Sequence, residues 1–203
     1  NSDLQADLIW GKARNDTAAH FRIDSVRGVS KRFKQNADAE STVSTGITAI
    51  GSDSFALGND GDFNDNSVNY VSWNWKEQAG VFDIVSYTGN ATSGATISHN
   101  LGVVPTMMIV KCRSVAGTNW IVYTAATGNT HWMYLNATNA AGANSAAWNN
   151  TSPTASQFSL GNDGDVNGNG RTYIAYLFGN KQGVSKMGSY TGNGNADGTF
   201  VYT

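Results

Sequence analysis

The sequence predicts an all-β protein, and three of its features support this fold class. The apolar segments are short, rich in Val, Ile, Tyr and Trp, and separated by clusters of Gly, Asn, Asp and Ser, which is typical of strands joined by turns. Residues 70–76 alternate between two faces with the period of two that a strand requires. Helical periodicity is nearly absent from the chain.

An internal repeat organises these segments into two units. FALGNDGD at residues 55–62 returns as FSLGNDGD at 158–165, and SYTGN at 86–90 returns at 189–193, with the same offset of 103. Self-similarity at a fixed period indicates repeated structural units. We therefore predict two tandem β-sandwich repeats of jelly-roll type that fold independently. The first comprises residues 1–100 and the second residues 101–203.

The other segments of the two units match in the same order along the chain. Three further pairs are residues 7–14 with 107–113, 24–28 with 124–128, and 95–100 with 198–203. The offset changes from 100 to 103 along the chain, which implies a three-residue insertion around residues 140–148, and insertions of this kind lie in loops. The stretch at residues 101–105 contains Gly and Pro, which favour a connection between the units.

One strand face is apolar in both units. The strand at residues 70–76 carries Trp73 and Trp75 on this face, and its counterpart carries Tyr176 and Phe178 at the matching positions. A face that stays apolar in both copies is expected to pack against the opposing sheet of a sandwich. We therefore predict that these four side chains belong to the core.

The composition limits the functional classes. Charged residues make up 14% of the chain and the net charge is -2, whereas an average soluble domain has about 25% charged residues. The longest apolar run, residues 103–110, is interrupted by Pro105 and is shorter than the roughly 20 residues of a membrane-spanning helix, so we expect no membrane insertion. Cys112 is the one cysteine, and we predict that it is a small buried apolar side chain in a strand.

Several motifs together resemble a known family. They are LIWGKARNDTAAHFRIDSVRG at residues 8–28, NADAES at 36–41, SDSFALG at 52–58, YVSWNWK at 70–76 and VSYTGNATSGATISHNLGVVP at 85–105. In their order they resemble a repeated domain of large tail-fibre-like proteins of marine bacteriophages, including cyanophages. The resemblance covers almost all of both units. It implies a concanavalin-A-like sandwich, a virion appendage, arrayed repeats and host-surface contact, and it implies no catalytic residues.

The residues give little support to an enzyme. A glycan-cleaving enzyme needs two carboxylates that face each other across a cleft, but Glu occurs only at Glu40 and Glu77, both in the first unit. The residues His20, His99 and His131 lie at non-equivalent positions without the spacing of a zinc site. We therefore predict that the protein has no enzymatic activity and no catalytic residues.

The two acidic turns are the best candidates for a metal site. Oxygen-bearing side chains occur at alternate positions, as in a calcium loop: Asp60, Asp62 and Asn64 in the first unit, and Asp163, Asp165, Asn167 and Asn169 in the second. The family that the chain resembles has fewer Asp residues in these turns. The twelfth position is Val71 in one copy and Ile174 in the other, so the bidentate Glu of an EF-hand is missing. We predict a structural role for these turns, with weak calcium binding as the alternative.

The first unit also contains a basic stretch. Seven of the 13 cationic residues lie between Lys12 and Lys34. No nucleic-acid-binding motif accompanies them, so a solvated strand face is the preferred interpretation and nucleic acid is not an expected partner. If the stretch has a function, attraction to an anionic surface polysaccharide fits it best.

A comparison of the two units predicts a contact surface. Its residues are charged in the first unit and mostly aromatic in the second: His20, Arg22, Arg32 and Lys34 match Trp120, Val122, Trp132 and Tyr134. Positions that accept Arg and Lys should be exposed, so Trp120, Trp132 and Tyr134 are candidates for stacking on sugar rings. Aromatic residues are equally enriched at protein interfaces, so an interface with a neighbouring unit or subunit is the alternative.

These observations lead to one expected function and two alternatives. We expect a repeat module of a phage tail fibre or similar virion appendage, located on the extracellular tail, that extends the structure and adheres to host-surface glycans. The expected partners are a host-surface polysaccharide, other virion proteins and further copies of the chain, with a trimer as one assembly. A secreted bacterial adhesin or carbohydrate-binding module is the first alternative, and a glycan-cleaving enzyme is the second.

Overall fold

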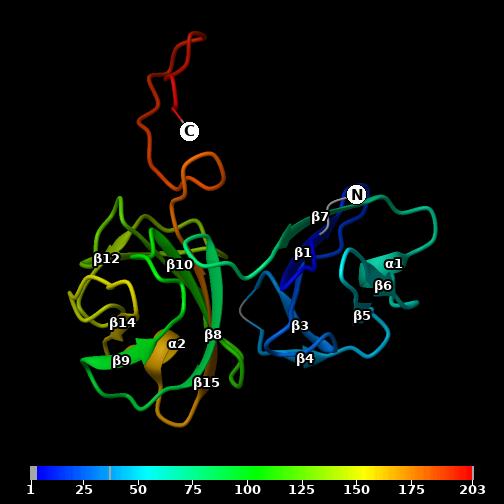
Figure 1. Cartoon of the computed structure of the whole chain (residues 1–203), viewed down its shortest axis with the longest axis horizontal. Helices are drawn as coiled ribbons and strands as arrows, with labels where there is room; N and C mark the ends of the chain where they lie inside the picture. Colours follow the sequence, from blue (N-terminus) through cyan, green and yellow to red (C-terminus); the bar gives the residue numbers. More distant parts are fainter. Residues whose placement is uncertain (1–3, 37, 203) are drawn as a thin grey trace.

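The fold is all-β, as predicted, with two larger sheets and two smaller ones (Figure 1). The computed structural model describes residues 4–36 and 38–202. The described chain contains two one-turn helices, α1 (Gly61–Asn64) and α2 (Gly164–Asn167). No helix among the described residues is long and apolar enough to cross a membrane.

The first larger sheet has five strands. Their order across the sheet is β4 (Ser41–Thr42), β3 (Lys31–Lys34), β2 (Phe21–Asp24), β1 (Leu8–Ala13) and β7 (Tyr70–Trp75). Strands β1 to β4 form an antiparallel meander, and β7 returns after a long connection to lie beside β1. This is the strand order of a Greek key.

The second larger sheet has six strands. Their order is β13 (Gly142–Ala143), β12 (His131–Tyr134), β11 (Trp120–Thr124), β10 (Met107–Cys112), β15 (Thr172–Phe178) and β8 (Phe82–Thr88). The first five follow each other as β4, β3, β2, β1 and β7 do in the first sheet. The sixth strand, β8, pairs with β15 in antiparallel register along all seven residues of both strands.

The two smaller sheets have two strands each. One contains β5 (Ile47–Ile50) and β6 (Phe55–Leu57), and the other contains β9 (Ala95–Ser98) and β14 (Gln157–Leu160). Ile47 of β5 belongs to the apolar cluster on one face of the first larger sheet. Phe158 and Leu160 of β14 belong to the cluster on one face of the second. Each smaller sheet therefore covers one face of a larger sheet.

The remaining faces of the two larger sheets pack against each other. Leu8 and Phe33 from the first sheet share a buried cluster with Trp120, Ile174 and Tyr176 from the second. Apolar side chains on both faces of the second sheet explain why β15 is buried at six of its seven positions. The layers therefore run from a small sheet through two larger sheets to the other small sheet.

The strand pairing does not follow the predicted division at residue 100. Strands β8 and β9 precede that residue, yet they pair with β15 and β14 of the second part. The sheets divide between Trp75, the last residue of β7, and Phe82, the first residue of β8. The predicted boundary at residue 100 is therefore wrong, because a strand from the first half of the chain completes the sheet of the second.

The predicted core face is only partly buried. Tyr176 and Phe178 are buried between the sheets, but Trp75 is half-buried and Trp73 is 44% exposed. The reason is the position of the strands, since β15 lies inside its sheet whereas β7 is the last strand of the first sheet. Cys112 is buried in β10, as predicted.

Candidate functional site

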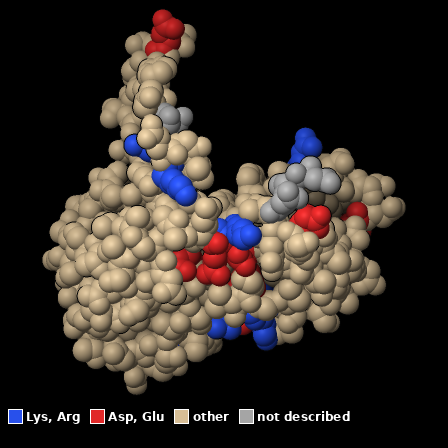
Figure 2. Space-filling view, viewed as in Figure 1, with Lys and Arg blue, Asp and Glu red and all other residues tan. Residues whose placement is uncertain are grey.

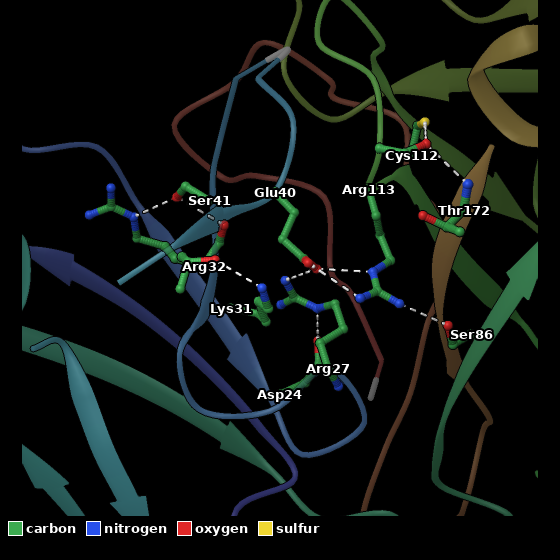
Figure 3. A network of polar contacts seen from close by, with 12 residues as sticks. Asp24, Arg27, Lys31, Arg32, Glu40, Ser41, Ser86, Cys112, Arg113 and Thr172 are labelled. Carbon is green, nitrogen blue, oxygen red and sulfur yellow. Dashed lines mark hydrogen bonds and ion pairs between the residues drawn. The ribbon is translucent and has the colours of Figure 1, made fainter. Parts of the chain in front are cut away.

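A buried ionic network connects the two larger sheets (Figure 3). Arg27 follows β2, and its guanidinium lies 2.5 Å from the Asp24 carboxylate, with both side chains fully buried. The same guanidinium contacts Glu40 at 3.2 Å, and Arg113, which follows β10, contacts Glu40 at 3.0 Å. The Tyr176 hydroxyl of β15 donates to Asp24 at 2.6 Å. Two of these links, Arg113 to Glu40 and Tyr176 to Asp24, cross from one part of the chain to the other.

The electrostatics of this network are those of a structural site. Burial alone would lower the pKa of Arg27, but Tyr176 and Asp24 raise it above its ordinary value. Burial alone would raise the pKa of Glu40, but hydrogen bonds from Arg113 and the charge of Arg27 lower it. Both groups are therefore held in their charged forms, and neither is prepared to exchange a proton as a catalytic acid or base would be.

A comparison of the two units in the sequence indicates that Asp24 and Arg27 of this network form a pair. Asp24 and Arg27 are three residues apart, and both are replaced by Thr in the second unit, as Thr124 and Thr127. Two opposite charges that occur together in one copy and are both absent from the other indicate a pair. Arg27 belongs to the basic stretch of the first unit but is buried, so this part of the stretch is not a solvated strand face.

Arg22 lies between two tryptophan rings at the junction of the parts. Its guanidinium carbon is 3.7 Å from the ring centre of Trp10 and 4.3 Å from that of Trp120. It donates to the Gln35 side chain at 3.0 Å. Burial lowers the pKa of Arg22 to about 9. The prediction that Arg22 is exposed is wrong, because a guanidinium can be buried when aromatic faces and a hydrogen bond replace water.

Trp120 is an interface residue. Its side chain is fully buried, its indole N–H donates to the Asn36 backbone carbonyl at 3.0 Å, and its ring meets Phe33 edge to face. Asn36 and Phe33 belong to the other part of the chain. Of the two alternatives for Trp120, stacking on a sugar is excluded by this burial, and contact with the neighbouring unit is what the structure contains.

Trp132 and Tyr134 remain accessible in part. Both are half-buried on β12, with ring centres 4.6 Å apart. The Trp132 ring lies over Gly142, where an added Cβ would meet it at 2.4 Å. Burial, with the nearby Asp165 and Asp163 carboxylates, raises the pKa of Tyr134. Trp132 and Tyr134 form a partly open aromatic patch, and the charges of Asp165 and Asp163 act on the Tyr134 phenol.

The matching positions in the first part form ion pairs. Arg32 lies 2.5 Å from the Asp62 carboxylate and Lys34 lies 3.1 Å from the same group. Arg32 also approaches Asp60 at 3.9 Å. The basic side chains at these positions therefore neutralise the acidic turn of their own part.

His20 has an internal partner as well. It accepts a hydrogen bond from the Trp10 indole at 2.8 Å and its ring is stacked on that of Trp73. Burial, followed by the charges of Arg22 and Lys12, lowers the pKa of His20. The contact surface predicted from His20, Arg22, Arg32 and Lys34 is thus largely engaged in internal contacts.

The acidic turns cap the two short helices. Asp60 accepts from the backbone N–H of Asp62 at 3.0 Å, and Asp163 accepts from that of Asp165 at 2.7 Å. Each is the N-cap residue of its helix. A side-chain oxygen of this kind satisfies one of the free N–H groups at a helix start. This use of the turns agrees with the predicted structural role.

The asparagines of the turns also make structural hydrogen bonds. Asn167 is buried and its amide group donates to the Gly161 carbonyl at 2.7 Å, while Asn64 donates to Gly58 at 2.9 Å. Among the described residues, no group of three or more His, Cys, Asp or Glu side chains is arranged to hold a metal ion.

Charge is unevenly distributed over the surface. Figure 2 shows basic and acidic side chains together near the junction of the two parts, while most of the second part is uncharged on that face. An uncharged surface rich in amides and hydroxyls suits neutral binding partners better than polyanions.

Comparison with known proteins gives a family. No curated protein and no solved structure matches the chain. A family described as "Domain of unknown function (DUF7483)" matches over residues 1–203. On the strength of this match over the full sequence, the chain belongs to the DUF7483 family.

Proposed function

We propose that the protein is a structural repeat module of a phage tail fibre or similar virion appendage. The observation that carries the proposal is the buried contact between the two larger sheets, an apolar cluster to which both contribute. This cluster and the ionic links from Arg113 to Glu40 and from Tyr176 to Asp24 join the two parts. Such a connection is suited to an extended appendage that transmits force, since pulling the parts apart must break this buried contact.

The internal repeat supports the same proposal. The successive strands of the two larger sheets follow the same order, and the sequence motifs match at a nearly constant offset. We interpret the two parts as diverged copies of one unit, as in arrays that grow by duplication. Other virion proteins and further copies of the chain, in a trimer for example, are the proposed partners.

Immunogold electron microscopy tests this proposal. An antibody raised against the protein should label tail appendages on phage particles whose genome encodes it. Label in the secreted fraction or on a bacterial surface, with unlabelled particles, would contradict the proposal and favour the secreted adhesin or carbohydrate-binding module. The genes beside the coding sequence give an independent check, because tail and capsid genes are expected there.

Adhesion to host-surface glycans is the second part of the proposal, and one specific patch favours it. Trp132 and Tyr134 offer adjacent, half-buried rings, and the charges of Asp165 and Asp163 act on the Tyr134 phenol. Aromatic faces pack on the apolar face of a sugar ring, and carboxylates accept hydrogen bonds from its hydroxyls. In the first part Arg32 and Lys34 hold the matching carboxylates in ion pairs, so the patch belongs to the second part.

Glycan-array binding of point variants tests the adhesion surface. Tyr134→Ala and Asp165→Asn should each weaken binding at least tenfold if sugar contacts both groups. Tyr202→Ala is the matched control, because Tyr202 is a strongly exposed aromatic residue outside the patch. Equal binding by the parent and both patch variants would remove the patch from the proposal.

A further inference from the structure

Strand β7 has a free edge. It is the last strand of the first larger sheet, whereas β15, at the matching place in the second sheet, is followed by β8. Trp73 on β7 is 44% exposed, while its counterpart Tyr176 on β15 is 1% exposed. An unpaired edge offers backbone N–H and C=O groups to any strand that can reach it. Among the described residues, no strand occupies this edge.

The C-terminal segment has the sequence of the strand that β7 lacks. SYTGN at residues 86–90 begins inside β8, and the same motif recurs at 189–193. At the offset of 103, residues 185–191 correspond to β8, but they form no strand. Tyr190 is 72% exposed and Phe200 is 87% exposed. The second copy therefore has the sequence of this strand without its pairing.

The turns around the segment already have the conformation found around β8. An isolated bridge joins Gln78 to Phe82 before β8, and the matching bridge joins Lys181 to Ser185. The glycine inside each turn has a positive φ, 79° at Gly80 and 74° at Gly183. The C-terminal segment therefore leaves β15 through the same turn by which β8 leaves β7.

A second turn is preserved farther along. The Asn90 side chain accepts from the Thr92 N–H at 2.9 Å, and the Asn193 side chain accepts from the Asn195 N–H at 3.0 Å. Both turns lie just beyond the SYTG sequence. The segment is thus locally arranged as the β8 region is, although it makes no sheet.

The first part also offers a hydrogen-bond acceptor to this segment, at Asn64. In the second part, the Asn167 amide donates to Gly161 and its oxygen accepts from the Asn90 N–H at 2.9 Å. In the first part Asn64 makes the matching bond to Gly58. Within the described chain, the Asn64 side-chain oxygen accepts no hydrogen bond, which leaves it available to the N–H of a segment like residues 189–193.

The way in which the two parts pack together indicates which segment can reach the free edge of β7. Both parts use matching faces to pack together, with Trp75 of β7 6.0 Å from Phe178 of β15, its own counterpart. Contact between equivalent faces closes on itself and does not propagate. In Figure 1, β7 lies at the upper edge of the first part and the C-terminal segment leaves the second part on the same side. Strand β8 follows β7 in the sequence but pairs in the second sheet. Residues 185–191 follow β15 of the second sheet, so the symmetric arrangement places them beside β7 in the first sheet.

We propose that residues 185–191 of the chain pair antiparallel with β7 of the same chain, as β8 pairs with β15. The register carried over from β8 places Met187 opposite Trp73, Gly188 opposite Ser72 and Tyr190 opposite Tyr70. Met187 then covers the exposed Trp73 ring, a contact that thioether and aromatic groups favour. The first sheet gains a sixth strand, and the edge of β7 is no longer free. This inference does not depend on whether the protein is a virion component.

Cysteine cross-linking tests the register. Ser72→Cys with Gly188→Cys places two thiols on directly opposed residues, at a separation that a disulfide can span. The control pair is Ser72→Cys with Asp197→Cys, because Asp197 lies on the same exposed segment but not opposite Ser72. Cys112 is buried and stays in place. Mild oxidation should cross-link the first pair at least tenfold faster than the control, and the product should be monomeric.

Two outcomes of the cross-linking would overturn the proposal. Equal rates for the two cysteine pairs would mean random encounters of the segment with β7. Cross-links found only in dimers would assign the β7 edge to a second copy and remove the same-chain pairing.

A glycine variant gives an independent test. A Cβ on Gly89 would meet the Gly168 carbonyl at 2.5 Å, whereas nothing lies within 4 Å of the matching Gly192. Gly192→Ala is therefore harmless to the undocked segment but should clash with the first part on docking. Gly198→Ala is the control, because Ala95 occupies the matching position. In hydrogen exchange, protection of residues 186–191 should be present in the parent and in Gly198→Ala and lost in Gly192→Ala. An unprotected parent, or equal protection in all three, would contradict the docking.

Discussion

At the scale of single residues, close backbone approaches determine which glycines cannot change. Gly161 lies beside the backbone carbonyl of Ala146, and an added Cβ would meet that oxygen at 2.1 Å. Because backbone must move to make room, Gly161→Ala should lower the free energy of unfolding by about 1–3 kcal/mol. Urea denaturation measures this change. Gly198→Ala, in open space, should stay within about 0.5 kcal/mol of the parent, and equal effects of the two variants would refute the packing argument.

The buried pair of Asp24 and Arg27 gives a second prediction. Asp24→Ala leaves the Arg27 guanidinium buried with only part of its charge compensated, and loss of one partner of a buried pair costs about 3–5 kcal/mol. The double variant Asp24→Ala/Arg27→Met should lose less stability than Asp24→Ala, because no unpaired charge remains. Denaturant titration of both variants tests this order, and a double variant less stable than the single one would contradict it.

The burial of Tyr173 predicts that folding stability depends on pH in the alkaline range. Burial raises the pKa of Tyr173 to about 12, whereas an unfolded Tyr titrates near 10. Between these values the unfolded state binds fewer protons than the folded state, so stability falls as the pH rises from about 10 to 12. Tyr173→Phe should reduce the slope of stability against pH in this range by the equivalent of up to one bound proton. Urea denaturation at pH 9 to 12 measures the slopes, and identical slopes would show that Tyr173 does not titrate in this way.

At the scale of elements, the acidic turns act through their helix caps. Asp163→Ala removes the acceptor for the Asp165 N–H and should cost about 1 kcal/mol, with or without calcium. Asp197→Ala, on the exposed segment, is the control. Thermal melting of the parent with micromolar calcium and with chelator should give the same midpoint. A rise of many degrees with calcium would contradict the structural role, because stabilisation grows with ligand bound to the folded state.

Sequence reasoning succeeded for elements and failed for their pairing. The matched motifs correctly located strands such as β7 and β15, because alternation and turn residues are local properties. The partner of β8 is not a local property, because β15 lies far from β8 in the sequence. An offset between motifs does not show towards which sheet the chain turns after β7.

The candidate site was predicted less well, for a reason that lies in particular side chains. The inference that Trp120 is exposed depended on the assumption that Arg22 and its neighbours face solvent. Arg22 is instead enclosed by Trp10 and Trp120, so an aromatic and a basic position can belong to the same buried layer. Trp132 and Tyr134, which pack on the opposite face of the second sheet, stay half-buried.

At the scale of the whole molecule, the buried contact between the two larger sheets should make unfolding cooperative. Phe82 of β8 is buried against Phe178 and near Trp75 of the other part. Phe82→Ala should cost about 3–5 kcal/mol, and the loss should be felt in both parts. Hydrogen exchange followed by mass spectrometry should then speed up in peptides from β1 and from β10 together. Faster exchange in β10 alone would mean that the two parts unfold separately.

The pairing of β8 with β15 also sets an order of events on the ribosome. The paired residues are separated by roughly 90 positions in the sequence, and synthesis proceeds at about 5–20 residues per second. For several seconds β8 has left the ribosome while its partner strand does not yet exist. Pairings between distant segments also form slowly. The nascent chain must therefore keep an apolar strand from aggregating until β15 emerges, and a protein shortened before β15 would never bury it.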